Sequence, residues 1–188
     1  MPGRVLITTE DFNLADEIET LRANDKRIGA VCSFIGTVRD RNMAPTLVTS
    51  RACGGTLPLS REDGALSPGG GPSAKDMVLS MELEHYPGMT EKSIEAMIDE
   101  AMKRFDIFGA RVVHRVGLLQ PLDQVVMVAV TSAHRGESFK ACEFLMDYLK
   151  TQAPFWKKEQ TPEGARWVDA RVTDDAALAR WGIQAGNA

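Results

Sequence analysis

The stretch VAVTSAHRGESFKACEFLMDYLKTQAPFWKKE, residues 128–159, decides the fold because it joins strand and helix patterns in one continuous run. The β-branched run Val125–Thr131 overlaps its start and predicts a strand. A helix is expected over about Glu137–Thr151, and it must end before Pro154, which cannot continue a helix. A second strand is expected over Phe155–Gln160. One face of the helix is apolar, with Phe139, Cys142, Met146 and Leu149.

Strand and helix patterns are intermixed along the rest of the chain. Further strands are expected at Arg4–Thr8, Ile28–Val38 (mostly buried), Met77–Glu84, Arg111–Val116 and Arg166–Arg171. Helices are expected after the cap Asn13, from the cap Thr90 to a stop at Gly109, and over Asp174–Trp181. The apolar stripe of the second helix is Ile94, Met97, Ile98, Ala101, Met102 and Phe105. Neighbouring strands would pair as hairpins at 111–131 and 155–171, so we expect an α+β layer structure.

The segment 43–76 differs in composition from the rest of the chain. It contains Gly54-Gly55, Pro58 and the run Ser67–Ser73, and it has no sustained hydrophobic period. Such a segment cannot offset the entropy lost on ordering, so it is expected to be a flexible surface insertion. With 188 residues and 44% hydrophobic content, the chain is expected to form one domain over 1–188 that carries this insertion.

The charge balance excludes several classes of partner. Lys and Arg number 22 and Asp and Glu 26, which gives a net charge of −4. No overall positive field would attract nucleic acid or an anionic membrane, so we expect neither partner. The apolar run Val125–Val130 is far shorter than the roughly 20 residues needed to span a bilayer. Because the start MPGRVLITTE lacks the apolar core of a secretory signal, a cytoplasmic protein is expected.

The cysteines and two of the histidines predict no metal site. Cys32, Cys53 and Cys142 are odd in number and not closely spaced, which argues against a disulfide framework and a zinc site. Cys32 and Cys142 fall in apolar patterns and are expected in the core. His85 and His114 lie in strands without a partner at metal-ligand spacing, so they are expected to be structural. We therefore expect neither a metal nor a cofactor.

Three polar segments end expected elements and carry the candidate chemistry. They are Thr37-Val38-Arg39, Ser132-Ala133-His134-Arg135, and Lys150 together with Lys157-Lys158-Glu159. His134 and Arg135 precede a helix, where the backbone N–H groups and the helix dipole favour an anion. An arginine there can bind phosphate with two parallel hydrogen bonds. A neutral lysine in the third segment could act as a base or nucleophile, with Glu159 orienting it.

Each of these segments also has a purely structural interpretation. Arg39 alone fits a solvated arginine at a strand end. Lys150 and Lys157 have apolar neighbours against which their stems can lie while their amines remain in water. From residue types alone, both interpretations stay open.

Several longer motifs together resemble one family. They are FIGTVRDRN at 34–42, LEHYPGMTEKSI at 83–94, VHRVGLL at 113–119, the opening stretch at 128–159, and TPEGARWVDA at 161–170. This combination resembles the large subunit of molybdopterin synthase. The segment 43–76 departs from the family, which ordinarily has a shorter loop there.

The resemblance implies a fold, partners and a reaction. The fold would be of the α/β-hammerhead type with an additional antiparallel β subdomain. The assembly would be a homodimer within a heterotetramer, with a small ubiquitin-like sulfur-carrier subunit at each end. The carrier's thiocarboxylated C-terminus would deliver sulfur twice to cyclic pyranopterin monophosphate and form the dithiolene of molybdopterin.

The family's site motif can be carried over residue by residue. It implies a substrate site formed by Thr37, Val38, Arg39, His134, Arg135, Lys150, Lys157, Lys158 and Glu159. Arg39, His134 and Arg135 would bind anions. Lys150 would be the first candidate for direct catalytic participation and Lys157 the second, with Arg171 at the rim. Because sulfur arrives on the carrier, no catalytic thiol is required.

Two alternatives remain at this stage. The chain could be a sulfurtransferase that forms a persulfide on one of its own cysteines. It could also be a docking module that binds a ubiquitin-like protein without chemistry.

Overall fold

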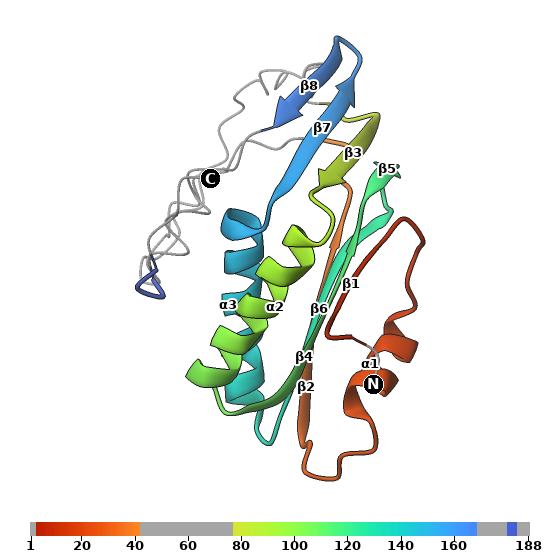
Figure 1. Ribbon diagram of the computed structural model, residues 1–188. Helices are drawn as coiled ribbons and strands as arrows, with labels where there is room; N and C mark the ends of the chain where they lie inside the picture. Colours follow the sequence, from red (N-terminus) through yellow and green to blue (C-terminus); the bar gives the residue numbers. More distant parts are fainter. Residues whose placement is uncertain (1–2, 42–76, 169–179, 184–188) are drawn as a thin grey trace, which may run out of the picture.

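The computed structural model describes residues 3–41, 77–168 and 180–183, which form two four-stranded sheets and three helices (Figure 1). The second sheet lies beyond one end of the first, above it in Figure 1. The insertion expected at 43–76 lies outside the described residues, as does nearly all of the helix expected at 174–181. Strands and helices are intermixed, which confirms the predicted α+β class.

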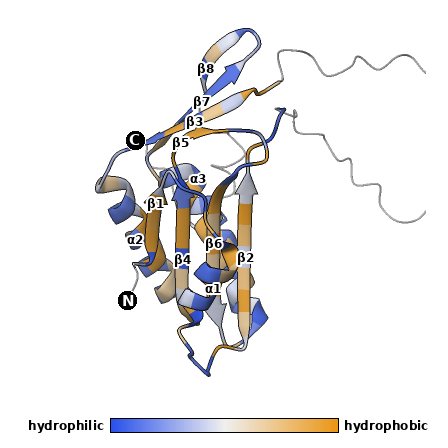
Figure 2. Cartoon of the chain, turned by 90° about the vertical axis from the view of Figure 1, so that its right-hand side faces the viewer, coloured by the Kyte–Doolittle hydropathy of each residue, from blue (hydrophilic) through white to orange (hydrophobic). Residues whose placement is uncertain are grey.

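The first sheet has the strand order β1-β4-β6-β2. Its strands are β1 (Val5–Thr8), β4 (Ile107–Arg115), β6 (Gln124–Ser132) and β2 (Ala30–Thr37). β1 runs parallel to β4, and the other pairs are antiparallel, including the predicted pairing of β4 with β6. Apolar residues run along these strands (Figure 2). The central pair is therefore the buried centre of the fold.

The prediction that 28–38 forms a mostly buried strand is wrong. β2 is an edge strand, and its side chains are half-buried or exposed on both faces. Val31 on one face and Phe34 on the other are 38% and 42% exposed. An edge strand has a neighbour on one side only, so a β-branched composition does not by itself ensure burial.

Helices cover both faces of the first sheet (Figure 1). On one face lie α2 (Met89–Arg104) and α3 (Arg135–Gln152), which enclose the main core with inward residues such as Val112 and Val128. On the other face α1 (Leu14–Arg22) covers Val113 and Met127. As predicted, the Asn13 side chain caps α1 by accepting a hydrogen bond from the Ala15 N–H, at 2.9 Å.

The predicted stripe of α2 is confirmed at Ile94, Met97, Ile98 and Ala101, and that of α3 at Cys142 and Leu149, whereas Phe139 and Met102 lie outside the buried faces. The face of α3 is centred on Ala141 and Leu145, so Phe139, which lies about 100° round the helix from Ser138, is 58% exposed. Met102 follows the fully buried Ala101 on α2 and is 39% exposed for the same reason. One residue of displacement is enough to move a large apolar side chain to the surface.

The ends of α2 also differ from the prediction. Gly88, not Thr90, is the N-cap residue, and its N–H donates to the Glu91 carboxylate at 2.6 Å. The buried Thr90 hydroxyl donates to the Tyr86 carbonyl at 3.0 Å. The helix ends at Arg104, and Gly109 lies within β4.

The second sheet is antiparallel throughout, in the order β5-β3-β7-β8. Its strands are β5 (Gly117–Leu119), β3 (Ser80–His85), β7 (Phe155–Thr161) and β8 (Gly164–Val168). The predicted hairpin of β7 with β8 is confirmed. A small apolar core of Val38, Met81, Leu83 and Leu119 lies on one face of this sheet.

Phe144 of α3 should be a principal contributor to stability. It is fully buried and makes edge-to-face contacts with Phe105, Tyr148 and Trp181, at 5.5 to 5.6 Å between ring centroids. Phe105 and Trp181 also contact each other, at 5.9 Å. We expect Phe144→Ala to lower the free energy of unfolding by about 3–5 kcal/mol, measured by urea denaturation. The matched control Phe139→Ala should stay within about 0.5 kcal/mol of the wild type. Equal losses in the two variants would contradict this core assignment.

Candidate functional site

A pocket of about 750 Å³ lies where the two sheets meet. Its walls come from the carboxyl end of β2, the last turns of α3, and the facing residues of β3, β4, β6, β7 and β8. The lining residues are Phe34, Ile35, Gly36, Thr37, Arg39, Met81, Leu83, His114, Val125, Val126, Met146, Leu149, Lys150, Ala153, Phe155, Lys157 and Val168. Most of the lining residues are apolar and a few are polar, which is the usual composition of a ligand site.

Thr37, Arg39, Lys150 and Lys157 are the predicted site residues that line this pocket. The end of β2 is shaped by Gly36, where an added Cβ would lie 2.9 Å from the Val126 side chain. The register of β2 against β6 shifts between residues 36 and 37, as in a β-bulge. The bulge changes the direction of the chain just before Arg39. The end of β2, the end of α3 and the start of β7 meet around the pocket.

Val38 does not line the pocket. It is 4% exposed and belongs to the small core of the second sheet. Its N–H donates to the Asp123 carbonyl at 2.9 Å, and its carbonyl accepts from the Leu122 N–H at 2.8 Å. Val38 therefore anchors the backbone between its two neighbours that face the pocket.

A buried carboxylate holds Lys157 in place. Glu159 is 2% exposed and accepts from the Lys157 amine at 2.8 Å and from Arg166 at 3.1 Å. A buried carboxylate needs such partners to remain charged. Among the described residues, Lys157 and Arg166 share this anion, so the summed charge of the three side chains is positive.

Lys158 points away from the pocket, although the sequence motif grouped it with Lys157. Successive side chains of a strand point to opposite faces. The Lys158 amine lies 5.5 Å from the centre of the Trp167 ring and 3.9 Å from the Glu82 carboxylate, on the outer face of the second sheet. Its predicted place in the substrate site is therefore not supported within this chain.

His134 and Arg135 lie at the opposite end of α3 from Lys150. His134 is the N-cap residue of this helix, both residues are exposed, and neither lines the pocket. Arg135 begins α3 and Lys150 lies in its last turn, so about 22 Å of helix separates them. A single copy of the chain therefore does not bring all of the predicted cations to one pocket. Arg171, expected at the rim, lies outside the described residues.

The sequence analysis did not assign His114 to the site, although it lines the pocket. Its ring stacks on Phe155, with 3.9 Å between centroids and 17° between planes. Burial lowers the pKa of His114 to about 4, so the ring is neutral at pH 7. Phe34 and Met146 also line the pocket and were not predicted to do so. Met146 could have been predicted, because it lies one helical turn before Lys150 and therefore on the same face of α3.

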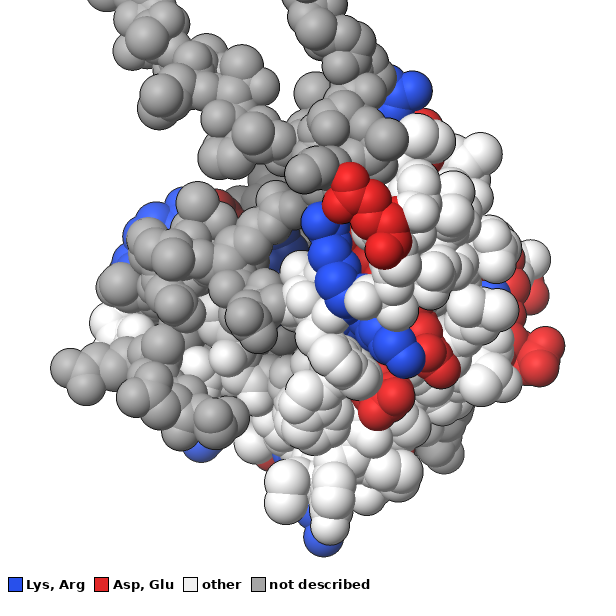
Figure 3. Space-filling model, turned by 90° about the horizontal axis from the view of Figure 1, so that it is seen from above, with Lys and Arg blue, Asp and Glu red and all other residues white. Residues whose placement is uncertain are grey.

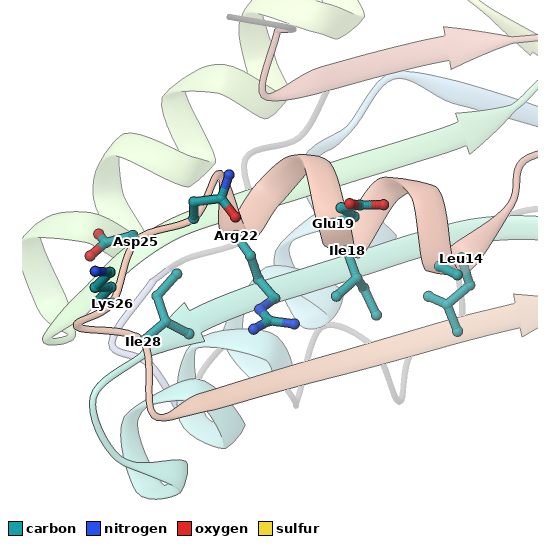
Figure 4. Close-up of a pocket in the computed structure, with 9 residues that line it drawn as sticks. Leu14, Ile18, Glu19, Arg22, Asp25, Lys26 and Ile28 are labelled. Atoms are coloured by element: carbon teal, nitrogen blue, oxygen red, sulfur yellow. The ribbon is translucent and has the colours of Figure 1, made fainter.

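A second hollow, of about 1050 Å³, lies beside α1 (Figure 4). It is lined by the helix and the loop after it, with Leu14, Ile18, Arg22 and Ile28 among its walls. None of the predicted site residues lies there. Although it is the larger hollow, we assign the site to the junction of the sheets, where Arg39, Lys150 and Lys157 come together.

The charges near the second sheet are mixed and do not form a uniform field. Viewed from that end, Lys and Arg side chains lie next to Asp and Glu side chains (Figure 3). Within the described ranges, no group of three or more His, Cys, Asp and Glu side chains is arranged to hold a metal ion. In the same ranges, no helix is both long and apolar enough to cross a membrane.

The two described cysteines lie at the main core. Cys142 is buried, and burial raises the pKa of its thiol to about 12. Cys32 is half-buried against the same core, and Cys53 lies outside the described residues. Because the thiolate is the nucleophilic form, Cys142 is poorly suited to carry a persulfide.

Comparisons with known proteins agree with the motifs. Residues 71–152 match the family model described as MoaE protein. The chain is 54% identical over 184 residues to the molybdopterin synthase catalytic subunit of Ralstonia nicotianae, covering 98% of this chain and 87% of that one. It is 40% identical to the catalytic subunit of Escherichia coli, with coverage of 95% and 97%.

Solved structures show the same relationship. The MoaE protein of Burkholderia ambifaria superposes with a TM-score of 0.70 at 48% identity, over 97% of this chain and 99% of that chain. Molybdopterin synthase from Staphylococcus aureus gives a TM-score of 0.66 at 25% identity, over 90% and 99%. The shared sequence and fold thus identify an enzyme subunit of molybdenum cofactor synthesis. The chain belongs to the MoaE family, the catalytic subunits of molybdopterin synthase.

Lys157 and Lys158 form a matched pair because they are adjacent in sequence and point to opposite faces of β7. We expect Lys157→Ala to lower the kcat of molybdopterin formation about 100-fold, since it removes a charge that faces the pocket. Lys158→Ala, measured at saturating concentrations of both substrates, should stay within about fivefold of the wild type. A larger loss of kcat for Lys158→Ala than for Lys157→Ala would refute the orientation described here.

Proposed function

We propose that this chain transfers sulfur from the thiocarboxylated C-terminus of a small ubiquitin-like carrier subunit to cyclic pyranopterin monophosphate. The observation that carries the proposal is the joint placement of Arg39, Lys150 and Lys157 around one apolar pocket in a member of this family. The substrate has a phosphate and a flat ring system, and the donor has an anionic acyl-sulfur group. Cationic side chains suit the two anions, and the apolar walls suit the ring.

In this proposal the chain supplies positioning, charge and proton transfer, while the carrier supplies the sulfur. Arg39 binds an anion at the mouth of the pocket. Lys150, at the end of α3, takes the first place for direct participation as a proton donor or acceptor, and Lys157, held by Glu159, takes the second. Thr37 contributes a hydroxyl to the same wall. The two sulfur transfers together form the dithiolene.

We also propose that the working assembly is a homodimer within a heterotetramer, with the α/β-hammerhead-type arrangement. The position of His134 and Arg135 supports this, because one copy of α3 cannot bring both of its ends to the same pocket. A second copy with its own α3 beside the pocket would supply the missing anion-binding pair. The chain acts as one catalytic unit over 1–188, with the segment 43–76 as an insertion.

Mixing two inactive variants tests this shared site. Arg135→Ala and Lys150→Ala should each lose most of their turnover as pure proteins. If each site takes Arg135 from one copy and Lys150 from the other, remixing the two variants after unfolding and refolding should restore about one quarter of the wild-type rate. Remixing each variant with itself is the control. No recovery in the mixture would exclude a site shared in this way.

Product formation from purified components tests the proposed reaction against its alternatives. The chain, the thiocarboxylated carrier and the pterin precursor should together yield molybdopterin, and the triple variant Cys32→Ala, Cys53→Ala, Cys142→Ala should keep within about threefold of the wild-type rate. Complete loss in a folded triple variant would favour a persulfide mechanism. Unchanged turnover in Lys150→Ala would remove its catalytic role, and absence of any product would favour a docking module.

A further inference from the structure

His114 occupies a position in the pocket that the proposed mechanism does not use. It lies near the end of β4, on the same face of the first sheet as Val112, beneath α2 and α3. Its side chain lines the pocket and is 9% exposed. The imidazole is therefore a largely buried polar group in the wall of the pocket.

The hydrogen bonding of this ring defines which of its two nitrogens is the acceptor. Nδ1 lies 2.8 Å from the Arg115 carbonyl oxygen. A carbonyl oxygen can only accept, so Nδ1 carries the proton and Nε2 of the neutral ring carries a lone pair. Within the part of the chain that the structure describes, Nε2 has no hydrogen-bond partner.

The neighbours of His114 keep its ring neutral and fixed in orientation. Phe155 of β7 stacks on one face of the ring, which holds its plane. His85 of β3 is the nearby titratable group, and it also disfavours a second positive charge. The Arg115 guanidinium is directed elsewhere, with its Nη1 3.4 Å from the Asp11 carboxylate and 3.0 Å from the Gln124 carbonyl.

The side chains that line the pocket include few other acceptors. Arg39 and the protonated forms of Lys150 and Lys157 are donors only. The Glu159 carboxylate is engaged by Lys157 and Arg166. Among the described side chains that line the pocket, apart from weakly accepting thioethers, the hydroxyl of Thr37 and Nε2 of His114 can accept a hydrogen bond.

We propose that His114 is a specificity-determining residue, whose Nε2 accepts a hydrogen bond from a ring or exocyclic N–H of the flat heterocyclic substrate. This inference rests on the proposed function, because a pterin presents such donors while its phosphate engages the cations. Where the substrate's N–H groups are covered by the pocket wall they lose their water, and without a facing acceptor they would stay unpaired, which is costly. A site with a placed acceptor discriminates against rings that lack the donor.

Three substitutions separate the acceptor from the rest of the imidazole. His114→Phe keeps the stacking on Phe155 but removes both nitrogens. His114→Gln places an amide oxygen near the position of Nε2, whereas His114→Asn reaches the position of Nδ1. His85→Gln, at a neighbouring histidine that does not line the pocket, is the matched control.

The experiment measures kcat and KM for the pterin at a saturating concentration of the thiocarboxylated carrier. KM for the carrier is measured separately. His114→Phe and His114→Asn should lower kcat/KM for the pterin roughly 10- to 100-fold, with KM for the carrier unchanged. His114→Gln should recover most of this loss, and His85→Gln should match the wild type. Thermal unfolding of each variant, and isothermal titration with the pterin precursor alone, accompany the kinetics.

The results that would overturn the inference are distinct from failure of the proposed function. An unchanged kcat/KM in His114→Phe, equal losses in the Gln and Asn variants, or a joint rise of KM for pterin and carrier would each overturn the role of Nε2. If His114→Phe does not fold, the ratio of pterin affinities of the Gln and Asn variants in the titration decides the question. If the wild type itself makes no product, the proposed function fails, and this inference fails with it.

Discussion

The short connections between the two sheets are the constraint on which the site depends. β4 ends at Arg115 and β5 begins at Gly117, whose φ of 82° allows the chain to leave one sheet and enter the other within a single residue. α3 ends at Gln152 and β7 begins at Phe155. Such short links leave the second sheet little freedom relative to the first. The pocket at their junction is therefore a product of the connectivity.

The same junction concentrates positive charge in an apolar surrounding without making the whole protein basic. The net charge is −4, and acidic and basic side chains are mixed on the surface near the second sheet. Within the pocket wall, Glu159 offsets part of the charge of Lys157 and Arg166 and orients the lysine. Local placement of a few cations thus provides anion binding that the overall charge would not suggest. The neutral His114 adds a hydrogen-bond acceptor to the pocket. Another cation at this position would increase the electrostatic repulsion among the lysine and arginine side chains.

Much of the fold was predictable because it depends on local patterns. The strands at 5–8, 80–85 and 124–132, the helices after Asn13 and before Pro154, and both hairpins follow from periodicity, capping and turn residues. The errors have a common cause. Whether β2 is buried, and whether Phe139 or Met102 faces the core, depends on which elements lie beside them. A periodic pattern does not contain that information.

For the site, the sequence by itself determined the chemical inventory: the arginines, lysines and glutamate in family motifs, and the strand and helix ends that carry them. Tertiary structure alone decided which of them meet. It separated Lys157 from Lys158 because alternate residues of a strand face opposite ways, and it placed Arg135 at the far end of α3 from Lys150. It also brought His114 into the pocket from β4. Convergence of side chains is a property of non-local packing, whereas residue type and local periodicity are properties of the chain.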